Sequence, residues 1–360
     1  MTNHKSQIRI GILTAPHIEF EQKQDTFVLK NVRIGIGFHW DRKEDQEFVG
    51  TLEIRNNPDG TQTAINTIDL EDYLCSVISS EMNANSPMEL LKAHAVISRS
   101  WAMRALQRPN HKGYDVCADD HCQRYEGLRR MNERAVEAIR ATKGQVLMYN
   151  GEICDCRYYK CCGGRTEIWR TCWEDIDVPY IQSVKCDWCD MSRQPAAVSR
   201  QILRLVLNDY DQETKDFRDW QVTYTAEELS EIVRTKSGID FGEIIDLIPL
   251  HRGASGRIDQ LKIVGTKRTE VIGKELKIRL WLSRSCLYSS WFEVEKEPLS
   301  IVPRHFVLSG HGWGHGAGLC QIGAAVMASE GHKYEEILQY YYVGSRLSPT
   351  ALEIQAPDGR

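Results

Sequence analysis

The sequence predicts an α+β protein, because strands and helices occupy separate blocks of the chain instead of alternating along it. Residues 1–66 read as strands, residues 69–107 become helical, and residues 144–190 return to short strands. A doubly wound sheet would need strand and helix in regular alternation. We therefore expect a helix pair packed on short antiparallel strands that form a groove, with an N-terminal β segment ahead of it.

The first two blocks carry separate signals. The N-terminal block contains the apolar or alternating runs IRIGIL, VRIGIGFHW and TLEIRNN, and the turn sequence NPDG follows at residues 57–60. The first helix is indicated by a single apolar stripe with spacings of four, seven and eight residues, formed by Leu70, Leu74, Val77 and Ile78. A helix therefore follows the strands directly.

A capping box predicts where the second helix begins. Ser86 would be the N-cap, Pro87 the first helical residue and Glu89 the acid that completes the box. The helix is expected to continue to about Gln107.

The remaining elements are shorter. We expect a polar loop at 108–127, a helix at 131–142, a loop or insertion near 190–220, a helix at 225–235, strands within 258–296, a glycine-rich strand at 308–318 and a helix near 321–330. As domains, the chain divides into an N-terminal β-rich segment (1–60), one large domain (61–346) and a C-terminal tail (347–360).

Composition and charge exclude several classes of protein. Apolar residues make up 42% and charged residues 26% of the 360 residues, which excludes collagen, a disordered polymer and a coiled coil. A net charge of −5 makes nucleic acid an unsuitable partner, because neutralising phosphates requires a basic face. No apolar run approaches the roughly 20 residues of a membrane-spanning helix, so we expect no membrane span.

The first twenty residues lack the apolar segment of a secretory signal. The chain would then stay in the cytoplasm, be exported by another route, or have lost its signal. Twelve cysteines fit either a disulfide-rich exported chain or a metal-binding one, and the number alone does not choose between them.

The helix pair offers a candidate acid and two candidate cations. Glu81 lies seven residues after Leu74, on the apolar side of the first helix near its end, where poor hydration would raise its pKa and suit a general acid. Lys92 and Arg99 are seven residues apart on the second helix, so they share a face that could bind a polar substrate. The alternative is that Glu81 is a helix-terminal acid that forms an ion pair with one of these cations.

The loop HKGYDVCADDHC contains a candidate metal site. His111, Cys117, His121 and Cys122 supply two imidazoles and two thiolates within twelve residues, enough for a closed tetrahedral zinc site of the structural kind. The spacing is not that of a zinc finger, and a Cys117–Cys122 disulfide with surface histidines is the alternative.

The segment GHGWGHGAGLCQIGA at 310–324 alternates glycine with larger residues. In an extended strand one face would be bare, and the other would present His311, Trp313 and His315. Trp313 could stack on a sugar ring and either histidine could hydrogen bond its hydroxyls. The alternative is a tightly packed strand with core histidines. The glycine spacing does not fit a dinucleotide-binding loop.

Seven further cysteines have no clear assignment. They are Cys154, Cys156, Cys161, Cys162, Cys172, Cys186 and Cys189. The Cys186–Cys189 pair could join Cys161 or Cys162 in a second metal site, but disulfides or buried thiols are the preferred interpretation.

Seven segments, in this order, resemble the SpoIID/LytB family of stage II sporulation protein D and its amidase-enhancer relatives. They are LEDYLCSVISSEM, SPMELLKAHAVISRSWAM, CADDHCQRYEG, TKGQVLMYNGEI, CGGRTE, WEDIDVPYIQSV and GHGWGHGAGLCQIGAAVMASEGHKYEEILQYYYVGS. The resemblance covers residues 60 to 346. The sequence departs from the family pattern at Cys162-Gly163-Gly164, where the family has Ser-Gly-Gly, and at Leu319-Cys320.

The resemblance implies a peptidoglycan lytic transglycosylase. Such an enzyme cleaves the MurNAc–GlcNAc bond of glycan strands, preferentially those without stem peptides, and leaves a 1,6-anhydro-MurNAc end. The family's catalytic glutamate corresponds to Glu81, and its lysine and arginine on the next helix to Lys92 and Arg99. Zinc binding in the 111–122 loop is implied for some members. We also expect sugar contacts from His311, Trp313, His315 and Gln321.

The family also sets the location and the rival functions. A cell-envelope location is expected from the function, although no signal peptide is visible. One rival is a non-catalytic wall-binding protein that stimulates an amidase, and another is a cytoplasmic zinc protein on the same scaffold. The sequence leaves the biological process, whether sporulation, division or wall turnover, undecided.

Overall fold

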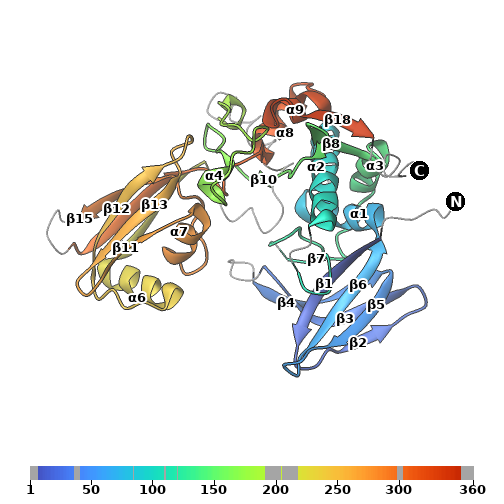
Figure 1. The fold of residues 1–360 in the computed structure, drawn as a ribbon, viewed down its shortest axis with the longest axis horizontal. Helices are drawn as coiled ribbons and strands as arrows, with labels where there is room; N and C mark the ends of the chain where they lie inside the picture. The colour runs from blue at the N-terminus through green and yellow to red at the C-terminus, as the bar shows by residue number, and fades with distance from the viewer. Residues whose placement is uncertain are drawn as a thin grey trace, which may run out of the picture.

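The α+β class is confirmed by the computed structural model, in which strands and helices form separate blocks (Figure 1). The structure describes residues 7–35, 41–83, 85–108, 111–119, 121–190, 204, 218–297 and 303–349. Two hydrophobic cores organise these residues. The first joins the N-terminal strands, the helix pair and the C-terminal helices, and the second lies within residues 220–308.

The N-terminal strands pair with one another in antiparallel fashion and belong to two small sheets. They are β1 (Gln7–Ala15), β2 (Phe20–Gln22), β3 (Thr26–Ile34), β4 (Arg42–Val49), β5 (Thr51–Asn56) and β6 (Gln62–Asp69). One sheet has the order β2-β3-β4. The other has the order β5-β6-β1-β7, in which β7 (Val116–Cys117) runs parallel to β1. The 111–122 loop is thereby attached to the N-terminal sheet, below the helices in Figure 1.

The helix pair follows these sheets without a linker. Helix α1 (Leu70–Glu81) begins directly after β6 because the Asp69 side chain caps it, accepting a hydrogen bond from the Glu71 amide at 3.0 Å. Helix α2 (Met88–Gln107) packs against α1 and α3 (Glu133–Ala141). Buried residues on α1 include Tyr73, Leu74, Val77 and Ile78, which contain most of the expected apolar stripe.

Short elements connect the helix pair to the second core. They are β8 (Gln145–Tyr149), β9 (Glu152–Ile153), β10 (Tyr158–Tyr159), α4 (Trp169–Cys172) and the 3₁₀ helix η1 (Asp187–Cys189). In Figure 1, β10 lies between the two lobes of the molecule, each of which contains one of the two hydrophobic cores.

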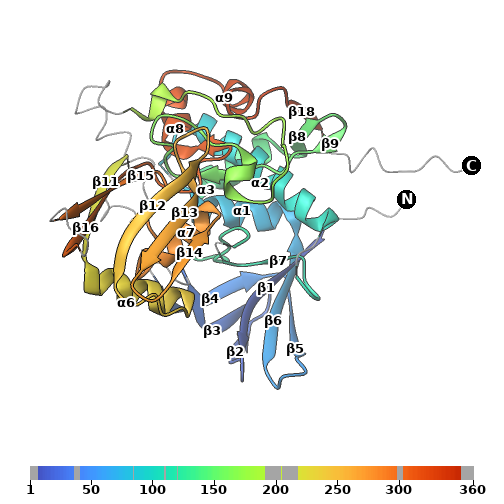
Figure 2. The same ribbon diagram turned by 60° about the vertical axis from the view of Figure 1, so that its left-hand side comes forward.

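The second core belongs to a separate lobe. Its elements are β11 (Asp219–Thr225), α6 (Ala226–Ser237), β12 (Ile244–Arg252), β13 (Ile258–Gly265), β14 (Thr269–Ile272), α7 (Glu275–Trp281), β15 (Phe292–Glu297) and β16 (His305–His311). They form two three-stranded sheets, β11-β16-β15 and β12-β13-β14. Helix α7 packs on β13 and α6 packs on β11 and β12, an arrangement visible in Figure 2.

The C-terminal part returns to the first core. Its elements are β17 (Leu319–Cys320), α8 (Gln321–Ser329), α9 (Tyr334–Tyr341) and β18 (Arg346–Pro349). Strand β17 pairs in parallel with β10, and β18 pairs with β8, so residues on both sides of the second lobe meet beside α2.

Several expectations about the elements were wrong. The capping box is absent: Pro87 is the N-cap of α2 and no side chain caps it, because the Glu89 carboxylate binds Lys92 and the Tyr334 amide instead. Helix α7 lies inside the expected strand block, and α9 was not expected. The expected insertion near 190–220 lies largely outside the described residues.

The glycine-rich segment is not an extended strand. Strand β16 ends at His311, and the next four glycines of the segment have φ between 76° and 99°. At Gly316 a Cβ atom would lie 2.5 Å from Arg257 Cζ. The glycines therefore permit an irregular backbone with positive φ, which larger residues rarely adopt. Among the described residues, no helix combines the length and apolar character needed to cross a membrane.

Candidate functional site

Glu81 is the last residue of α1 and lies partly buried beneath two hydrogen-bond donors. The Arg124 amide donates to its Oε1 atom at 3.0 Å, and the Tyr158 hydroxyl donates to the same atom at 2.9 Å. The donors come from the loop after the 111–122 segment and from β10. The carboxyl group is therefore held by segments far apart in the sequence.

Burial raises the pKa of the Glu81 carboxyl group above its ordinary value, since the charged form loses hydration. The hydrogen bonds from Arg124 and Tyr158 and the nearby positive charge of Lys160 act in the opposite direction. Burial is the largest of these effects. A carboxyl group with a raised pKa retains its proton at higher pH, as a general acid requires.

His94 and Gln321 extend this cluster. The His94 ring packs edge-on against Tyr158, with ring centroids 4.3 Å apart. Its Nε2 atom lies 3.1 Å from Gln321 Nε2, and its Nδ1 atom lies 3.2 Å from Ser98 Oγ. Burial lowers the pKa of His94 to about 3, so the imidazole is neutral at physiological pH.

Sequence reasoning identified Glu81 and Gln321 but missed their neighbours His94, Tyr158 and Arg124. His94 had a usable signal, because it lies on the buried face of α2, a helix whose approximate extent was predicted. Tyr158 and Arg124 had none, since Tyr158 lies in the two-residue strand β10 and Arg124 lies in a loop, and the position of both depends on tertiary contacts.

The two expected cations, Lys92 and Arg99, form ion pairs with other acids and not with Glu81. The Lys92 ammonium binds Glu89 Oε1 at 2.9 Å and lies over the Tyr334 ring. Arg99 is fully buried, and its Nε and Nη2 atoms each donate to Glu71 at 2.7 Å. Arg99 also donates to the carbonyl oxygens of residues 139 and 145. The alternative of an ion pair between Glu81 and one of these cations does not occur.

The three expected sugar contacts in the glycine-rich segment have different environments. His311 is exposed and lies 2.6 Å from Asp219 Oδ1. Trp313 is partly buried and packs edge-on against Tyr288. The His315 ring packs against Trp173, and burial lowers its pKa well below the ordinary value. Only His311 is well exposed to solvent.

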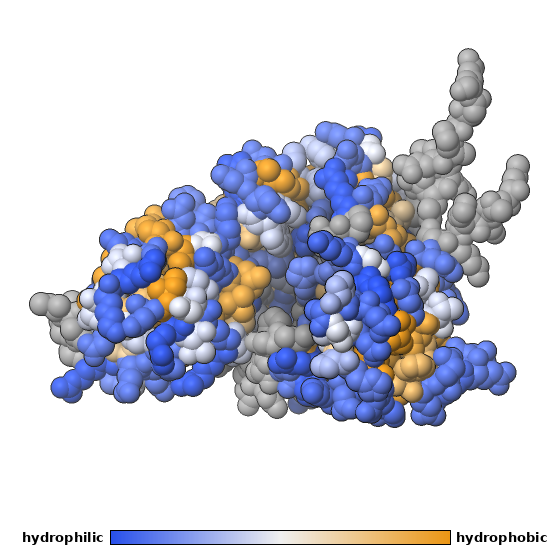
Figure 3. Space-filling view, turned by 60° about the horizontal axis from the view of Figure 1, so that its bottom comes forward, coloured by the Kyte–Doolittle hydropathy of each residue, from blue (hydrophilic) through white to orange (hydrophobic). Residues whose placement is uncertain are grey.

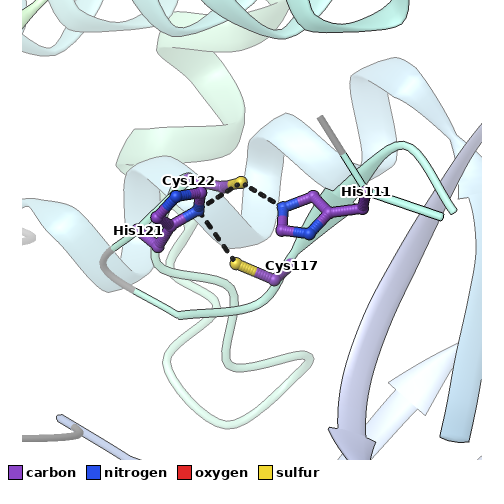
Figure 4. Close-up of side chains that lie close together, drawn as sticks. All are labelled: His111, Cys117, His121 and Cys122. Atoms are coloured by element: carbon purple, nitrogen blue, oxygen red, sulfur yellow. Dashed lines mark hydrogen bonds between the residues drawn. The ribbon is translucent and has the colours of Figure 1, made fainter. Parts of the chain in front are cut away.

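The 111–122 loop brings its four candidate ligands together (Figure 4). One ligand atom from each of His111, Cys117, His121 and Cys122 lies within 4.8 Å of the others. His111 Nε2 is 3.2 Å from Cys122 Sγ, and His121 Nδ1 is 3.6 Å from the same sulfur. The Cys122 thiol and the His121 ring lower the pKa of Cys117 to about 4, with the hydrogen bond from Cys122 the larger effect. This donor set fits tetrahedral zinc.

The loop leads directly to Glu81. Cys122 is two residues before Arg124, whose amide binds the Glu81 carboxylate. The loop also lines a cavity of about 240 Å³, together with residues of β1 and β3. Glu81 lines neither this cavity nor a surface hollow beside α4. Figure 3 shows a hollow between the two lobes.

Comparisons with known proteins match two parts of the chain to family models. Residues 58–149, which contain the helix pair and the 111–122 loop, match a family model described as Stage II sporulation protein. Residues 167–318 match a second model, described as a domain of unknown function.

Full-length relatives extend this match. Stage II sporulation protein D of Bacillus subtilis is 26% identical over 304 residues, which are 79% of this chain and 76% of that protein. An uncharacterized protein of Brachyspira hyodysenteriae is 29% identical over 83% of this chain and 71% of its own length. The amidase enhancer of Bacillus subtilis is 25% identical over 76% of this chain, but only 40% of that protein is matched. The resemblance to the SpoIID family is therefore confirmed.

Proposed function

We propose that this protein is a peptidoglycan lytic transglycosylase that cleaves MurNAc–GlcNAc bonds in glycan strands without stem peptides, with Glu81 as its single general acid and base. One observation carries the proposal. The Glu81 carboxyl group is partly buried, has a raised pKa, and is held at one oxygen by the Arg124 amide and the Tyr158 hydroxyl.

A single carboxyl group suffices for this reaction. Ordinary glycosidases use two carboxyl groups because a water molecule or a nucleophile must also be activated. In a lytic transglycosylase the protonated Glu81 donates its proton to the glycosidic oxygen as the bond from C1 to that oxygen breaks. The C6 hydroxyl of the same MurNAc then forms a bond to C1, and its proton passes to the Glu81 carboxylate. The acid is regenerated and no water is consumed.

The surrounding residues support this role by position. Tyr158 and Arg124 fix Oε1, and the neutral His94 packs beside Tyr158 without adding a charge that would ionise Glu81. The exposed His311 is the residue that we retain as a sugar contact, with the partly buried Trp313 as a stacking surface, whereas Gln321 is buried against His94. Arg99 is omitted because Glu71 and backbone carbonyl oxygens occupy its donors.

We also propose that His111, Cys117, His121 and Cys122 bind a structural zinc ion. Four protein ligands leave no open position, so the ion would stabilise the loop and take no part in the chemistry. The convergence of the four ligand atoms within 4.8 Å supports this assignment. Metal analysis of the wild type and of the Cys117→Ser/Cys122→Ser variant tests it: the variant should contain one zinc fewer, and equal contents would refute the site.

The test of the activity is digestion of denuded glycan strands by the wild type and by Glu81→Gln. Mass spectrometry should find 1,6-anhydro-MurNAc ends with the wild type, and Glu81→Gln should form them about 10²–10⁴-fold more slowly. A known lytic transglycosylase serves as the positive control. If the wild type produces no such ends under conditions in which the control does, the protein is not a lytic transglycosylase.

A second candidate function is stimulation of an amidase without glycan cleavage. It is favoured by the match to the amidase enhancer, which covers 76% of this chain. On this proposal wild type and Glu81→Gln would sediment equally well with glycan strands and stimulate an added amidase to the same extent, and neither would release anhydro ends.

A further inference from the structure

A second group of cysteines meets in the first core, away from the 111–122 loop. Cys162 follows β10, Cys186 and Cys189 lie at the two ends of the η1 region, and Cys320 ends β17. The four sulfur atoms all lie within 4.8 Å of one another. Each residue is at most 1% exposed. Three segments that are distant in sequence thus place four thiols around one point.

We propose that Cys162, Cys186, Cys189 and Cys320 bind a single zinc ion, as a second and purely structural metal site. Four thiolates are a preferred ligand set for zinc, and the Cys-x-x-Cys spacing of 186 and 189 is typical of structural zinc sites. Tetrahedral coordination with Zn–S bonds of 2.3 Å requires sulfur atoms ~3.8 Å apart. The sulfurs of Cys162 and Cys189, 3.1 Å apart in this structure, need only a small adjustment.

Backbone amides point at these sulfur atoms. The amides of Cys162 and Gly323 donate to Cys320 Sγ at 3.3 and 3.4 Å, and the amide of Gly164 donates to Cys162 Sγ at 3.3 Å. Amide donors stabilise a thiolate, the form that binds metal, and they orient the ligands from outside the coordination sphere. Buried thiols that served only as apolar packing would not need such donors.

The surroundings are closed around the sulfurs. The Tyr341 hydroxyl lies 3.3 Å from Cys186 Sγ. A Cβ atom at Gly323 would lie 2.7 Å from the same sulfur and 2.3 Å from that hydroxyl, so the glycine provides needed space. The site has four protein ligands, and none of them lines the cavity beside the 111–122 loop or the surface hollow beside α4. It therefore fits a structural ion and not a catalytic one.

Two alternative states fit the geometry less well. Two disulfides would draw the sulfurs into separate pairs about 2.05 Å apart, whereas each sulfur here is near all three others and no disulfide is present among the described cysteines. An iron–sulfur cluster holds several iron and sulfide ions between its thiolates and needs them further apart. Cys161 is the sequence neighbour of Cys162 and is also buried, but it is outside the four cysteines that share one centre.

The site would stabilise one wall of the Glu81 cluster. Cys320 is the N-cap of α8, and the next residue, Gln321, contacts His94. Cys320 also pairs with Tyr159, the neighbour of Tyr158, across β10 and β17. A metal ion at Cys320 would thus hold both Gln321 and the strand that supplies the Tyr158 hydroxyl.

Metal content of the full-length protein tests the proposal. The Cys186→Ser/Cys189→Ser variant should contain one zinc per chain fewer than the wild type. The matched control is Cys154→Ser/Cys156→Ser, which changes two equally buried cysteines outside the group and should keep the wild-type content. The comparison holds whether or not the 111–122 loop binds zinc, because that loop is unchanged in all three proteins. Equal zinc in the wild type and Cys186→Ser/Cys189→Ser would overturn the proposal.

Measurements on the wild type alone cover the case in which the variant does not fold. Titration in denaturant with chelator and without reductant should find all twelve thiols, whereas two disulfides in the group would leave eight. Replacement of the zinc by Co²⁺ should give the strong thiolate charge-transfer absorption of a tetrahedral four-cysteine site. Eight thiols, or iron with the visible absorption of an iron–sulfur cluster in the isolated protein, would contradict a zinc site.

Discussion

Tyr158 and Glu81 are 77 positions apart in the sequence, yet the Tyr158 hydroxyl oxygen lies 2.9 Å from Glu81 Oε1. The hydrogen bond connects the end of α1 to β10, and β10 is in turn paired with β17 ahead of α8. The carboxyl group at the centre of the proposed reaction is therefore positioned by the C-terminal part of the chain as well as by its own helix.

Replacement of Tyr158 by phenylalanine should move the pH–rate profile. The hydroxyl group favours the ionised carboxylate, so its loss raises the pKa of Glu81 further. Because the acid must be protonated to act, the rate falls as pH rises through this pKa, and the alkaline limb should move to higher pH. The maximum rate should change by about tenfold or less, the effect of one hydrogen bond. Anhydro-end formation measured against pH checks this.

Tyr159→Phe is the matched control for this change. Tyr159 is the adjacent residue of the same strand and is buried, and the tyrosine hydroxyl that donates to Glu81 is that of Tyr158. The pH–rate profile of Tyr159→Phe should have its alkaline limb at the same pH as that of the wild type. A Tyr158→Phe limb that stays in place or moves to lower pH would contradict the role given to the hydroxyl.

Glu81→Gln should be at least as stable as the wild type at neutral pH. The folded protein raises the pKa of Glu81 above its ordinary value of 4.5, so ionisation of this group opposes folding. This destabilisation is absent below pH 4.5, grows as pH rises towards the folded pKa, and persists above it. Glutamine stays neutral and can accept the same two hydrogen bonds. The stability of Glu81→Gln relative to the wild type should therefore increase with pH.

Urea unfolding of both proteins at several pH values measures this difference. Glu71→Gln is the control, because it removes the charge that pairs with buried Arg99 and should destabilise the protein. If Glu81→Gln were less stable than the wild type at pH 8, burial would not be the main influence on the Glu81 carboxyl group.

Replacement of Arg99 should lower the stability of the protein much more than replacement of Lys92. Arg99→Ala leaves Glu71 without its partner and removes a fully buried guanidinium, so it should lower the free energy of unfolding by about 3–5 kcal/mol. Lys92→Ala removes a partly exposed ion pair with Glu89 and should cost about 1 kcal/mol or less. Urea unfolding distinguishes the two. An Arg99→Ala protein of wild-type stability with a raised KM would instead indicate direct contact with the glycan.

The parts of the fold that the sequence predicted were those with local signals. The apolar stripe around Leu74 defined α1, and the strand blocks defined the α+β class. The apparent capping box at Ser86 located the beginning of α2 correctly for a wrong reason, because Glu89 makes tertiary contacts with Lys92 and the Tyr334 amide. Local patterns do not reveal such competition for a side chain.

The site was only partly predictable for the same reason. Glu81 and the four candidate ligands of the 111–122 loop were indicated by short-range patterns, the apolar stripe of α1 and the spacing of His and Cys within twelve residues. The hydrogen-bond donors to Glu81 and the group around Cys320 depend on which distant segments meet, and that information lies in the topology of β10 and β17. The alternating glycines suggested an extended strand that the structure does not contain, since a strand pattern does not reveal the positive φ of Gly316 and its neighbours.

Loss of the zinc ion proposed for the 111–122 loop should affect the Glu81 carboxyl group through Arg124. The Arg124 amide is two residues from Cys122 and donates to Glu81 Oε1 at 3.0 Å, a contact that lowers the pKa of the carboxyl group. If the zinc ligands hold this amide in place, Cys117→Ser/Cys122→Ser should lower the rate of anhydro-end formation and shift the alkaline limb to higher pH, as in Tyr158→Phe. A general loss of stability would reduce the rate without moving the alkaline limb.

Cys286→Ser is the control, because it changes a partly buried cysteine in the other lobe, and it should leave both the rate and the position of the alkaline limb unchanged. If the alkaline limb of Cys117→Ser/Cys122→Ser stays at its wild-type position, the proposed zinc ion and the Glu81 carboxyl group are not coupled.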